Sequence, residues 1–407
     1  MTGETAHVDI ARRPLGDYEA AAGAEALERV RALAEPLAGA RVLHLAAGSS
    51  AGRPATLLGS VLPLLRGVGI EVEWRVLSGG PAFESTARNL DNGLRGAETA
   101  ISDEDWEAYT STWRRVDVSG CDAVVAHDPA ALGAVAARAQ DGGPRWLWHC
   151  HVDASAPDAP AWERASVQAA AYDVHALPLR AFAPPGIDGA HELRPGIDPL
   201  APRNRELPVK LAGDALRFLG IDLSRPFACQ VGALDPWQDP HETIDAFRLA
   251  KRELPELQLV LAGDDEPDWR IAGEVADYAG EVEDLLVLSG YVGVGETELN
   301  AMQLLARAAL HVSLHEGFGL GASEALWKGT PVVGIPRGGI PEQVHDGEHG
   351  FLAEGAEAIA ARLVELVGDP ALGIVLGQAG RARVRERFLI TRLLEDELAL
   401  LHATLAP

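Results

Sequence analysis

Residues 315–329 read HEGFGLGASEALWKG, and the two acids of this stretch, Glu316 and Glu324, have seven residues between them. The apolar run 309–314 predicts a buried strand, and residues 321–328 predict the helix that follows it. The glycines therefore fall on a strand-to-helix turn, where backbone N–H groups at the helix N-terminus can face an anion. Two carboxylates around such a turn favour a phosphorylated ligand. The alternative is an ordinary connection with a solvated acid at each end.

This pattern of Glu, seven residues and Glu, with Gly-Phe-Gly-Leu inside it, resembles the motif of the retaining glycosyltransferases of the glycogen-synthase and sucrose-synthase kind. The similarity is closer still to the trehalose glycosyltransferring synthases, which join a nucleotide-diphosphate glucose to free glucose. The resemblance implies an α/β chain with the GT-B fold, in which two Rossmann-like domains face an interdomain cleft. Further similar stretches are collinear over nearly the whole chain; they are residues 62–66, 125–129, 146–153, 235–237 and 346–352.

Composition agrees with a two-domain enzyme. The chain has 407 residues, 47% of them hydrophobic, which is enough for two domains with cores of their own. It has no apolar run of the ~18 residues that a membrane-spanning helix needs, and its N-terminus lacks a basic region followed by an apolar one, so we expect a soluble, cytoplasmic protein. The formal net charge of -25 argues against nucleic acid or an anionic membrane as a partner, because both require a basic face.

Two series of alternating strands and helices predict the two domains. The prolines of residues 195–203 interrupt regular structure between the series, so we expect a hinge there. The predicted domains are residues 1–200 and 201–385, and by the resemblance the C-terminal helix, residues 386–407, crosses back to the first. Such alternation predicts parallel sheets covered on both faces, with ligands beyond the carboxyl ends of the strands. The expected strands are 42–46, 72–77, 123–126, 146–152, 174–179 and 191–194, then 227–231, 258–262, 285–288, 310–314 and 332–335.

A second glycine-containing turn, residues 47–55, follows the first expected strand. Pro54 suits the first turn of a helix, so Gly52 and Arg53 are expected at its positive end as donor-binding residues. The resembled synthases carry three successive glycines where this chain has Ala51, Gly52 and Arg53. The change narrows the space available to a ligand and adds a cation. A plain turn with a solvent-facing arginine is the alternative.

Several histidines and an acid are expected near the ends of two strands of the first domain. His149 and His151 share one face of a strand, and with a carboxylate they could bind a metal. The resemblance favours a metal-independent enzyme, in which His151 faces the donor sugar and Asp153 lies near the acceptor. His127, His149 and Trp237 are candidates for the acceptor side, and a purely structural role is equally open for the two histidines.

The resemblance also implies a mechanism that retains the configuration of the sugar without a covalent intermediate. Glu316, His151 and Asp153 are then the catalytic candidates, and Glu316 holds hydroxyls of the donor sugar. Glu324 binds the ribose of the nucleotide. Backbone groups of Gly317, Phe318, Gly319 and Leu320 cradle the phosphates. No cofactor is expected besides the nucleotide-diphosphate sugar, which is a substrate.

The sequence departs from the resembled family at residues 230–239, QVGALDPWQD. The family places an arginine and a lysine on the departing diphosphate, whereas this chain has Ala233 and Gln238. Gln238 stays a candidate donor contact without the charge. A hydrogen bond to a charged group contributes roughly 1.5–3 kcal/mol, so two losses are large enough to abolish useful turnover.

Three functions stay open from these residues. The first is an active transferase for a small-molecule donor and acceptor, with an altered donor or acceptor from specialised metabolism, in which Arg53 or Arg337 compensates for the missing cations. The second is a catalytically silent homologue that binds a sugar or nucleotide. The third is a phosphorylase-like enzyme that uses inorganic phosphate. Assembly as a homodimer is possible in each case.

Overall fold

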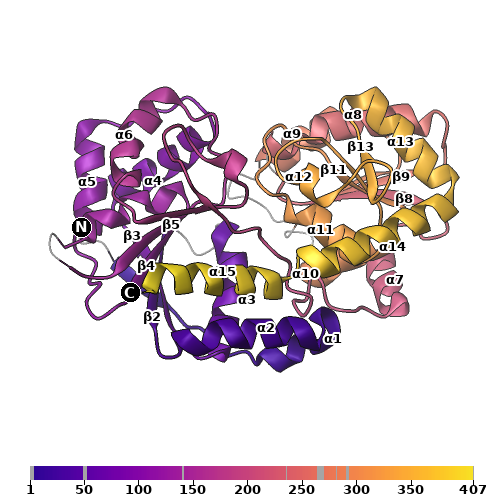
Figure 1. The fold of residues 1–407 in the computed structure, drawn as a ribbon. Coiled ribbons are helices and arrows are strands. Elements are labelled where there is room, and N and C mark those ends of the chain that lie inside the picture. Colours follow the sequence, from indigo (N-terminus) through magenta and orange to yellow (C-terminus); the bar gives the residue numbers. More distant parts are fainter. Residues whose placement is uncertain are drawn as a thin grey trace. The chain divides into compact units, whose positions relative to one another are not determined.

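The protein consists of two compact α/β units, each built around one sheet (Figure 1). Unit 1 comprises residues 1–196 and 390–407, and unit 2 comprises residues 197–389. Among the described residues, no helix is long and apolar enough to cross a membrane. The computed structural model describes residues 4–48, 53–139, 142–234, 236–263, 270–280, 282–289 and 293–406.

The sheet of unit 1 has the strand order β1-β3-β2-β4-β5-β6-β7. Neighbours from β3 to β7 are parallel, which confirms the sequence prediction, but β1 pairs antiparallel with β3. The sequence analysis missed β1 because this edge strand, ETAHV, lacks an apolar run. The strands are β1 (Glu4–Val8), β2 (Arg41–Ala47), β3 (Glu71–Ser78), β4 (Ala123–His127), β5 (Arg145–His149), β6 (Val174–Leu177) and β7 (His191–Glu192).

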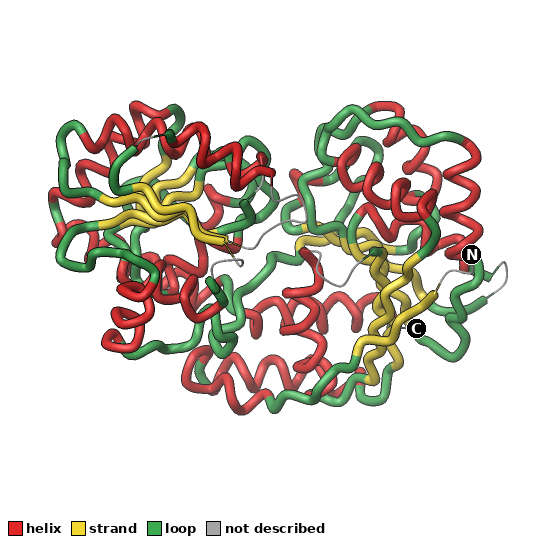
Figure 2. The backbone as a smooth tube through the Cα atoms, turned by 180° about the vertical axis from the view of Figure 1, so that it is seen from behind, coloured by secondary structure: helices red, strands yellow, loops and turns green. Residues whose placement is uncertain are grey.

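Helices cover both faces of this sheet (Figure 2). On one face, Val42, Val125 and Leu147 of the strands pack with Leu58 of α3 and Leu394 of α15 in a single core. The helix α15 comes from the end of the chain and packs on α2 and α3 (Figure 1), so the last residues complete the core of unit 1. The helices of unit 1 are α1 (Glu19–Ala22), α2 (Ala24–Ala34), α3 (Arg53–Gly67), α4 (Pro81–Leu94), α5 (Asp103–Trp113), α6 (Ala159–Ala169) and α15 (Ile390–Leu405), with the 3-10 helix η3 (Pro129–Ala137).

The sheet of unit 2 is parallel throughout, with the order β10-β9-β8-β11-β12-β13. Its strands are nearly continuous apolar runs, as expected for a sheet buried on both faces. They are β8 (Phe227–Val231), β9 (Gln258–Gly263), β10 (Leu285–Ser289), β11 (Ala308–His311), β12 (Val332–Gly334) and β13 (Gly350–Leu352).

The helices of unit 2 form two layers (Figure 1). One layer contains α8 and α13, which pack on each other, and the other contains α10 and α11. Phe247 of α8 and Leu363 of α13 belong to the main core of this unit. The helices are α7 (Val209–Phe218), α8 (Pro240–Lys251), α9 (Arg270–Ala279), α10 (Glu296–Leu305), α11 (Leu320–Trp327), α12 (Ile340–Gln343), α13 (Ala356–Gly368) and α14 (Pro370–Arg387).

Each sheet has one strand from which the strand order runs in opposite directions. In unit 1 this strand is β2, with β3 on one side and β4 on the other; in unit 2 it is β8, with β9 on one side and β11 on the other. Ligands of open α/β sheets bind beyond the carboxyl ends of the strands at such a switch point. β4 ends at His127 and β11 ends at His311. The candidate residues therefore follow the strands at the two switch points.

Candidate active site

The carboxylate of Glu316 is held at the switch point of unit 2 by a histidine. His311, the last residue of β11, is buried, and its Nε2 lies 2.6 Å from Glu316 Oε2. The strand was predicted to span 310–314, but β11 ends at His311. Beyond it the chain leaves the sheet, and the backbone N–H of Leu314 donates to the carbonyl of Trp237, at 2.8 Å, in place of a neighbouring strand. This turn aims residues 315–319 out of the sheet.

Only glycine fits at the start of α11. Gly319 has a φ of 79°, and a Cβ added there would lie 2.5 Å from Ile340 Cδ1 and 3.0 Å from His311 Nε2. Gly338 packs on the same turn, since its Cβ would lie 2.4 Å from the carbonyl oxygen of Glu316. The turn is therefore tight, and it places the N-terminus of α11 beside Glu316.

Gln343 holds the turn and the helix together. Its Nε2 donates to the carbonyls of Phe318 and Gly339, and its Oε1 accepts hydrogen bonds from both Ser323 N, at 3.0 Å, and Ser323 Oγ, at 2.6 Å. Gln343 is fully buried, so these bonds are shielded from water. They fix the backbone amides near the helix start before any ligand arrives.

Glu324 lies on α11, in the middle of the helix that follows the Glu316 turn, and its neighbours carry charges. Its carboxylate is buried and 3.9 Å from Arg203 Nη1, and burial raises its pKa while Arg203 and Lys328 oppose that effect. Lys328 donates to Asn204 Oδ1, Gln303 Oε1 and the backbone carbonyl of Glu324 at 3.0–3.1 Å. Burial lowers the pKa of the Lys328 amine to about 8.

The turn after β8 lies against the turn after β11. Gln230 Nε2 donates to the carbonyl of Gln238, at 2.6 Å, and the rings of Trp237 and His315 pack edge to face with centroids 5.8 Å apart. Ala233 and Gln238 are both half-buried here. A cation, Arg337, reaches the turn after β11: it donates to the carbonyl of Ser313, at 3.4 Å, and pairs with Glu354 at 2.6 Å.

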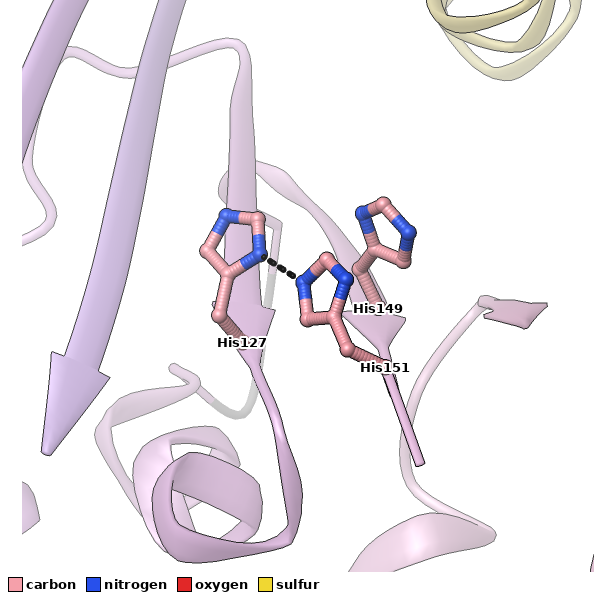
Figure 3. Close-up of side chains that lie close together, drawn as sticks. All are labelled: His127, His149 and His151. Atoms are coloured by element: carbon pink, nitrogen blue, oxygen red, sulfur yellow. Dashed lines mark hydrogen bonds between the residues drawn. The ribbon is translucent and has the colours of Figure 1, made fainter. Parts of the chain in front are cut away.

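Histidine rings occupy the switch point of unit 1 (Figure 3). His127 Nδ1 lies 3.0 Å from His151 Nε2, and the rings of His149 and His151 have centroids 4.0 Å apart. His44 of β2 joins them, with its Nδ1 2.9 Å from His127 Nε2. Burial lowers the pKa of His44 to about 3, with the neighbouring His149 adding to the effect. Burial also holds the pKa of His127 and of His149 well below the ordinary value.

Two acids follow these strands. Asp128 has a φ of 65°, and its Oδ1 accepts the backbone N–H of His151 at 2.9 Å, which ties the end of β4 to the residues after β5. Asp153 is half-exposed and accepts the N–H of Ser155 at 2.9 Å. His127, His149 and His151 could each offer one nitrogen to a metal ion, because these atoms lie within 4.8 Å of one another.

The second glycine turn is only partly described. Gly52 and the side chain of Arg53 lie outside the described residues, and the backbone of Arg53 begins α3. Their predicted roles stay predictions.

Sequence reasoning missed several residues of the site: His44, His311, Arg203 and Gln343. The first two had a usable signal, because each is a lone histidine in a buried strand: His44 lies in the middle of RVLHLAA, and His311 ends AALH. Arg203 and Gln343 had none, since each is brought to α11 from a distant segment.

Comparisons with known proteins agree with this architecture. Residues 44–184 match the family model of trehalose synthase, N-terminal domain, and residues 214–383 match that of glycosyl transferases group 1. The structure resembles that of a UDP-forming α,α-trehalose-phosphate synthase from Burkholderia xenovorans, with a TM-score of 0.70 and 14% identity over 90% of this chain and 100% of that one. The fold and its two switch points are thus those of a GT-B glycosyltransferase.

Sequence similarity places the chain within that class. The trehalose synthase of Rubrobacter xylanophilus is 37% identical over 406 residues, 97% of either chain. This protein belongs to the trehalose synthase family of glycosyltransferases. A shorter similarity, 29% identity over 185 residues, covers 40% of this chain and 25% of the trehalose phosphorylase of Pleurotus pulmonarius.

Proposed function

We propose that the protein is a retaining glycosyltransferase that moves a sugar from a nucleotide-diphosphate sugar to a small-molecule acceptor. Membership of the trehalose synthase family supports the reaction class. The uncharged residues Ala233 and Gln238 at the expected diphosphate contacts support a donor or acceptor different from that of the relatives, as in specialised metabolism. The proposal requires no cofactor beyond the donor itself.

The observation that carries the proposal is the Glu316 turn of unit 2. The carboxylate of Glu316 lies 2.6 Å from His311 Nε2, and it is beside the N-terminus of α11, whose N-cap is Gly319. A carboxylate suits sugar hydroxyls, which are hydrogen-bond donors, whereas the amides and positive end of a helix suit phosphate oxygens. A nucleotide-diphosphate sugar carries both groups next to each other.

In this reaction the protein mainly positions the partners and stabilises charge. The bond between the sugar carbon C1 and the diphosphate oxygen breaks, and the bond from C1 to the acceptor oxygen forms on the same face. The acceptor proton passes to the leaving phosphate. Glu316 orients the donor sugar, the turn 317–320 stabilises the growing negative charge, and Glu324 binds the ribose, while His151 and Asp153 of unit 1 bind the sugars.

The cations absent at Ala233 and Gln238 need a replacement for this chemistry to proceed. Arg337 is one candidate, since it already contacts the carbonyl of Ser313 at the β11 turn and pairs with an exposed acid, Glu354. Arg53 is the other, because its backbone begins α3. Either would supply a charge-assisted contact to the diphosphate.

Ligand-induced stabilisation tests the proposal. The thermal midpoint is followed while UDP, GDP, ADP, dTDP and inorganic phosphate are titrated separately, since a ligand that binds only the folded state raises the midpoint. We expect one nucleoside diphosphate to stabilise the protein strongly. The corresponding nucleotide sugar, incubated with candidate acceptors, should then release that diphosphate, and NMR of the fresh product should show a retained anomeric configuration. An inverted product would contradict the retaining mechanism.

A phosphorylase-like function is the second candidate, because part of the chain is similar to a trehalose phosphorylase. It makes a distinct prediction in the same titration, namely stabilisation by phosphate and by no nucleotide. Absence of stabilisation by every ligand would instead favour a catalytically silent homologue.

A further inference from the structure

Three histidines of unit 1 form a continuous chain of ring-to-ring hydrogen bonds, which we call the histidine chain: His44, His127 and His151. Its two links measure 2.9 Å, from His44 Nδ1 to His127 Nε2, and 3.0 Å, from His127 Nδ1 to His151 Nε2. Neighbouring rings are nearly parallel, with interplanar angles of 13° and 16°. Figure 3 shows the second link, with His149 beside His151.

The number of protons in the chain follows from these distances. A nitrogen–nitrogen contact of about 3 Å is a hydrogen bond only if one nitrogen carries a proton and the other offers a lone pair. Three neutral imidazoles carry three protons, and the two links use two of them. The third proton must therefore sit at one end of the chain, on His44 Nε2 or on His151 Nδ1.

The burial of His44 decides between the two ends. His44 is 3% exposed, and its buried Nε2 has no hydrogen-bond partner among the residues that the structure describes. A proton on that atom would be an orphaned buried donor, which folded proteins avoid more strictly than an unused acceptor. The lone pair therefore belongs on His44 Nε2, and every proton of the chain is oriented toward His151.

We propose that His44 and His127 are positioning residues, which fix the proton of His151 on Nδ1 and so make this ring a neutral hydrogen-bond donor for an uncharged sugar oxygen. His44 Nδ1–H donates to His127, and His127 Nδ1–H donates to His151 Nε2, which becomes the acceptor. The assignment of a sugar as the ligand rests on the proposed function; the proton arrangement does not.

Neutrality is consistent with the surroundings of the chain. Burial keeps the pKa of both His44 and His127 far below neutrality, and the mutual repulsion of the histidines adds to this effect. Asp128 is the carboxylate beside the rings, and its Oδ1 accepts the backbone N–H of His151. A neutral donor suits a sugar hydroxyl, whereas a phosphate would favour a cationic ring.

A metal ion is the competing use of these rings, since His127, His149 and His151 could each offer one nitrogen. His127 already uses Nε2 toward His44 and Nδ1 toward His151. An ion would have to break one of the two links. The hydrogen-bonded chain accounts for both nitrogens of His127 without rearrangement, so we favour it.

Nitrogen NMR of ¹⁵N-histidine-labelled protein tests the inference directly, because protonated and bare ring nitrogens have different chemical shifts. We expect His151 to be protonated on Nδ1 and bare on Nε2, and His44 to be bare on Nε2, at pH 7. Protonation of His151 on Nε2 would overturn the inference. Displacement of the His127 and His151 signals by one equivalent of Zn²⁺ would establish a metal site instead.

Variants of His44 separate positioning from simple packing. His44→Leu removes the first donor and should lower the fraction of His151 protonated on Nδ1. His44→Asn should restore that fraction, because its amide nitrogen occupies about the position of Nδ1. An unchanged His151 tautomer in His44→Leu would contradict the inference. If that variant does not fold, His127→Leu removes the donor at the next link and should lower the same fraction, whereas His127→Asn should restore it.

Kinetics extend the test once a donor and acceptor are known. His44→Leu should lower kcat about tenfold, or about 1.4 kcal/mol, with little change in KM. The exposed His191→Asn is the control and should leave both unchanged. The NMR result does not depend on turnover, so failure of the proposed function and failure of the histidine chain are distinguishable.

Discussion

The two switch points of this protein differ in the charge of their buried ionisable groups. In unit 1, burial keeps His44, His127 and His149 uncharged. In unit 2, Glu324 is buried next to two cations, Arg203 and Lys328. Burying a charge is tolerable only with partners, so each unit shows one of the two available solutions.

The difference indicates which part of a substrate each unit suits. A neutral site loses little by binding an uncharged sugar, because no strongly hydrated ion has to lose its water. A site of paired charges and helix amides already presents hydrogen-bond donors and acceptors, so these groups can bind the phosphates and ribose of a nucleotide. The proposed division of labour, with the nucleotide on unit 2, follows from this contrast.

Glu397 of α15 gives the sharpest test of the neutral character of unit 1. It is buried, one carboxyl oxygen has no hydrogen-bond partner within the described part of the chain, and burial raises its pKa to about 8 from an ordinary value of 4.5. Between these values the folded state holds a proton that the unfolded state lacks, so stability falls as pH rises from 4.5 to 8 and levels off above. The loss is about 1.4 kcal/mol per pH unit.

The neutral variant Glu397→Gln removes this loss. Relative to the wild type, it should gain several kcal/mol of unfolding free energy between pH 5 and pH 8, measured by urea unfolding at each pH. The exposed Glu386→Gln on α14 is the matched control and should show no such gain. A constant difference between Glu397→Gln and the wild type across this range would mean that Glu397 is ionised in the folded protein.

Glu316→Gln tests the donor site of unit 2. It replaces the proposed charged acceptor of sugar hydroxyls by a neutral amide, and we expect turnover to fall roughly 100-fold, about 2.7 kcal/mol. Affinity for the nucleoside diphosphate, which lacks the sugar, should change far less when measured by calorimetry. Equal losses of turnover and affinity would show that Glu316, bonded to His311, has only a structural role.

Restoring charge at the β8 turn tests whether this unit lacks cations for the diphosphate. The double variant Ala233→Arg with Gln238→Lys adds two charge-assisted contacts and should tighten diphosphate binding at least ~10-fold. Arg337→Ala should weaken binding in the wild type and matter less in the double variant. If the double variant binds no tighter and Arg337→Ala has no effect, the diphosphate is bound elsewhere.

Glu324→Ala should have the smallest effect, a loss of about tenfold in nucleotide affinity from the ribose contact. The fold should survive, because Lys328 donates to the backbone carbonyl of Glu324 and to Asn204 and Gln303, not to the substituted carboxylate. Glu296→Gln, which removes another acid that pairs with Arg203, is the control and should leave affinity unchanged. Unchanged affinity in Glu324→Ala would remove the ribose assignment.

Local sequence patterns predicted most of the fold. The strands 227–231 and 123–126 were recognisable because a strand buried on both faces must be a continuous apolar run, and β8 and β4 cover those residues. The edge strand β1 has no such run and was missed. The end of β11 was also misjudged, since a backbone bond from Leu314 to Trp237, a distant partner, terminates the strand.

The sequence by itself determined the α/β alternation and the Glu316–Glu324 turn, because periodicity and motif spacing are local properties, and the resemblance of that motif to a known family indicated a glycosyltransferase. Only the tertiary structure decided how those residues are held and charged. His44 meets His127 across 83 positions of sequence, and Gln343 reaches Ser323 across 20. Hydrogen bonding and burial depend on which segments the fold brings together, and these contacts set the protonation of each group at the site.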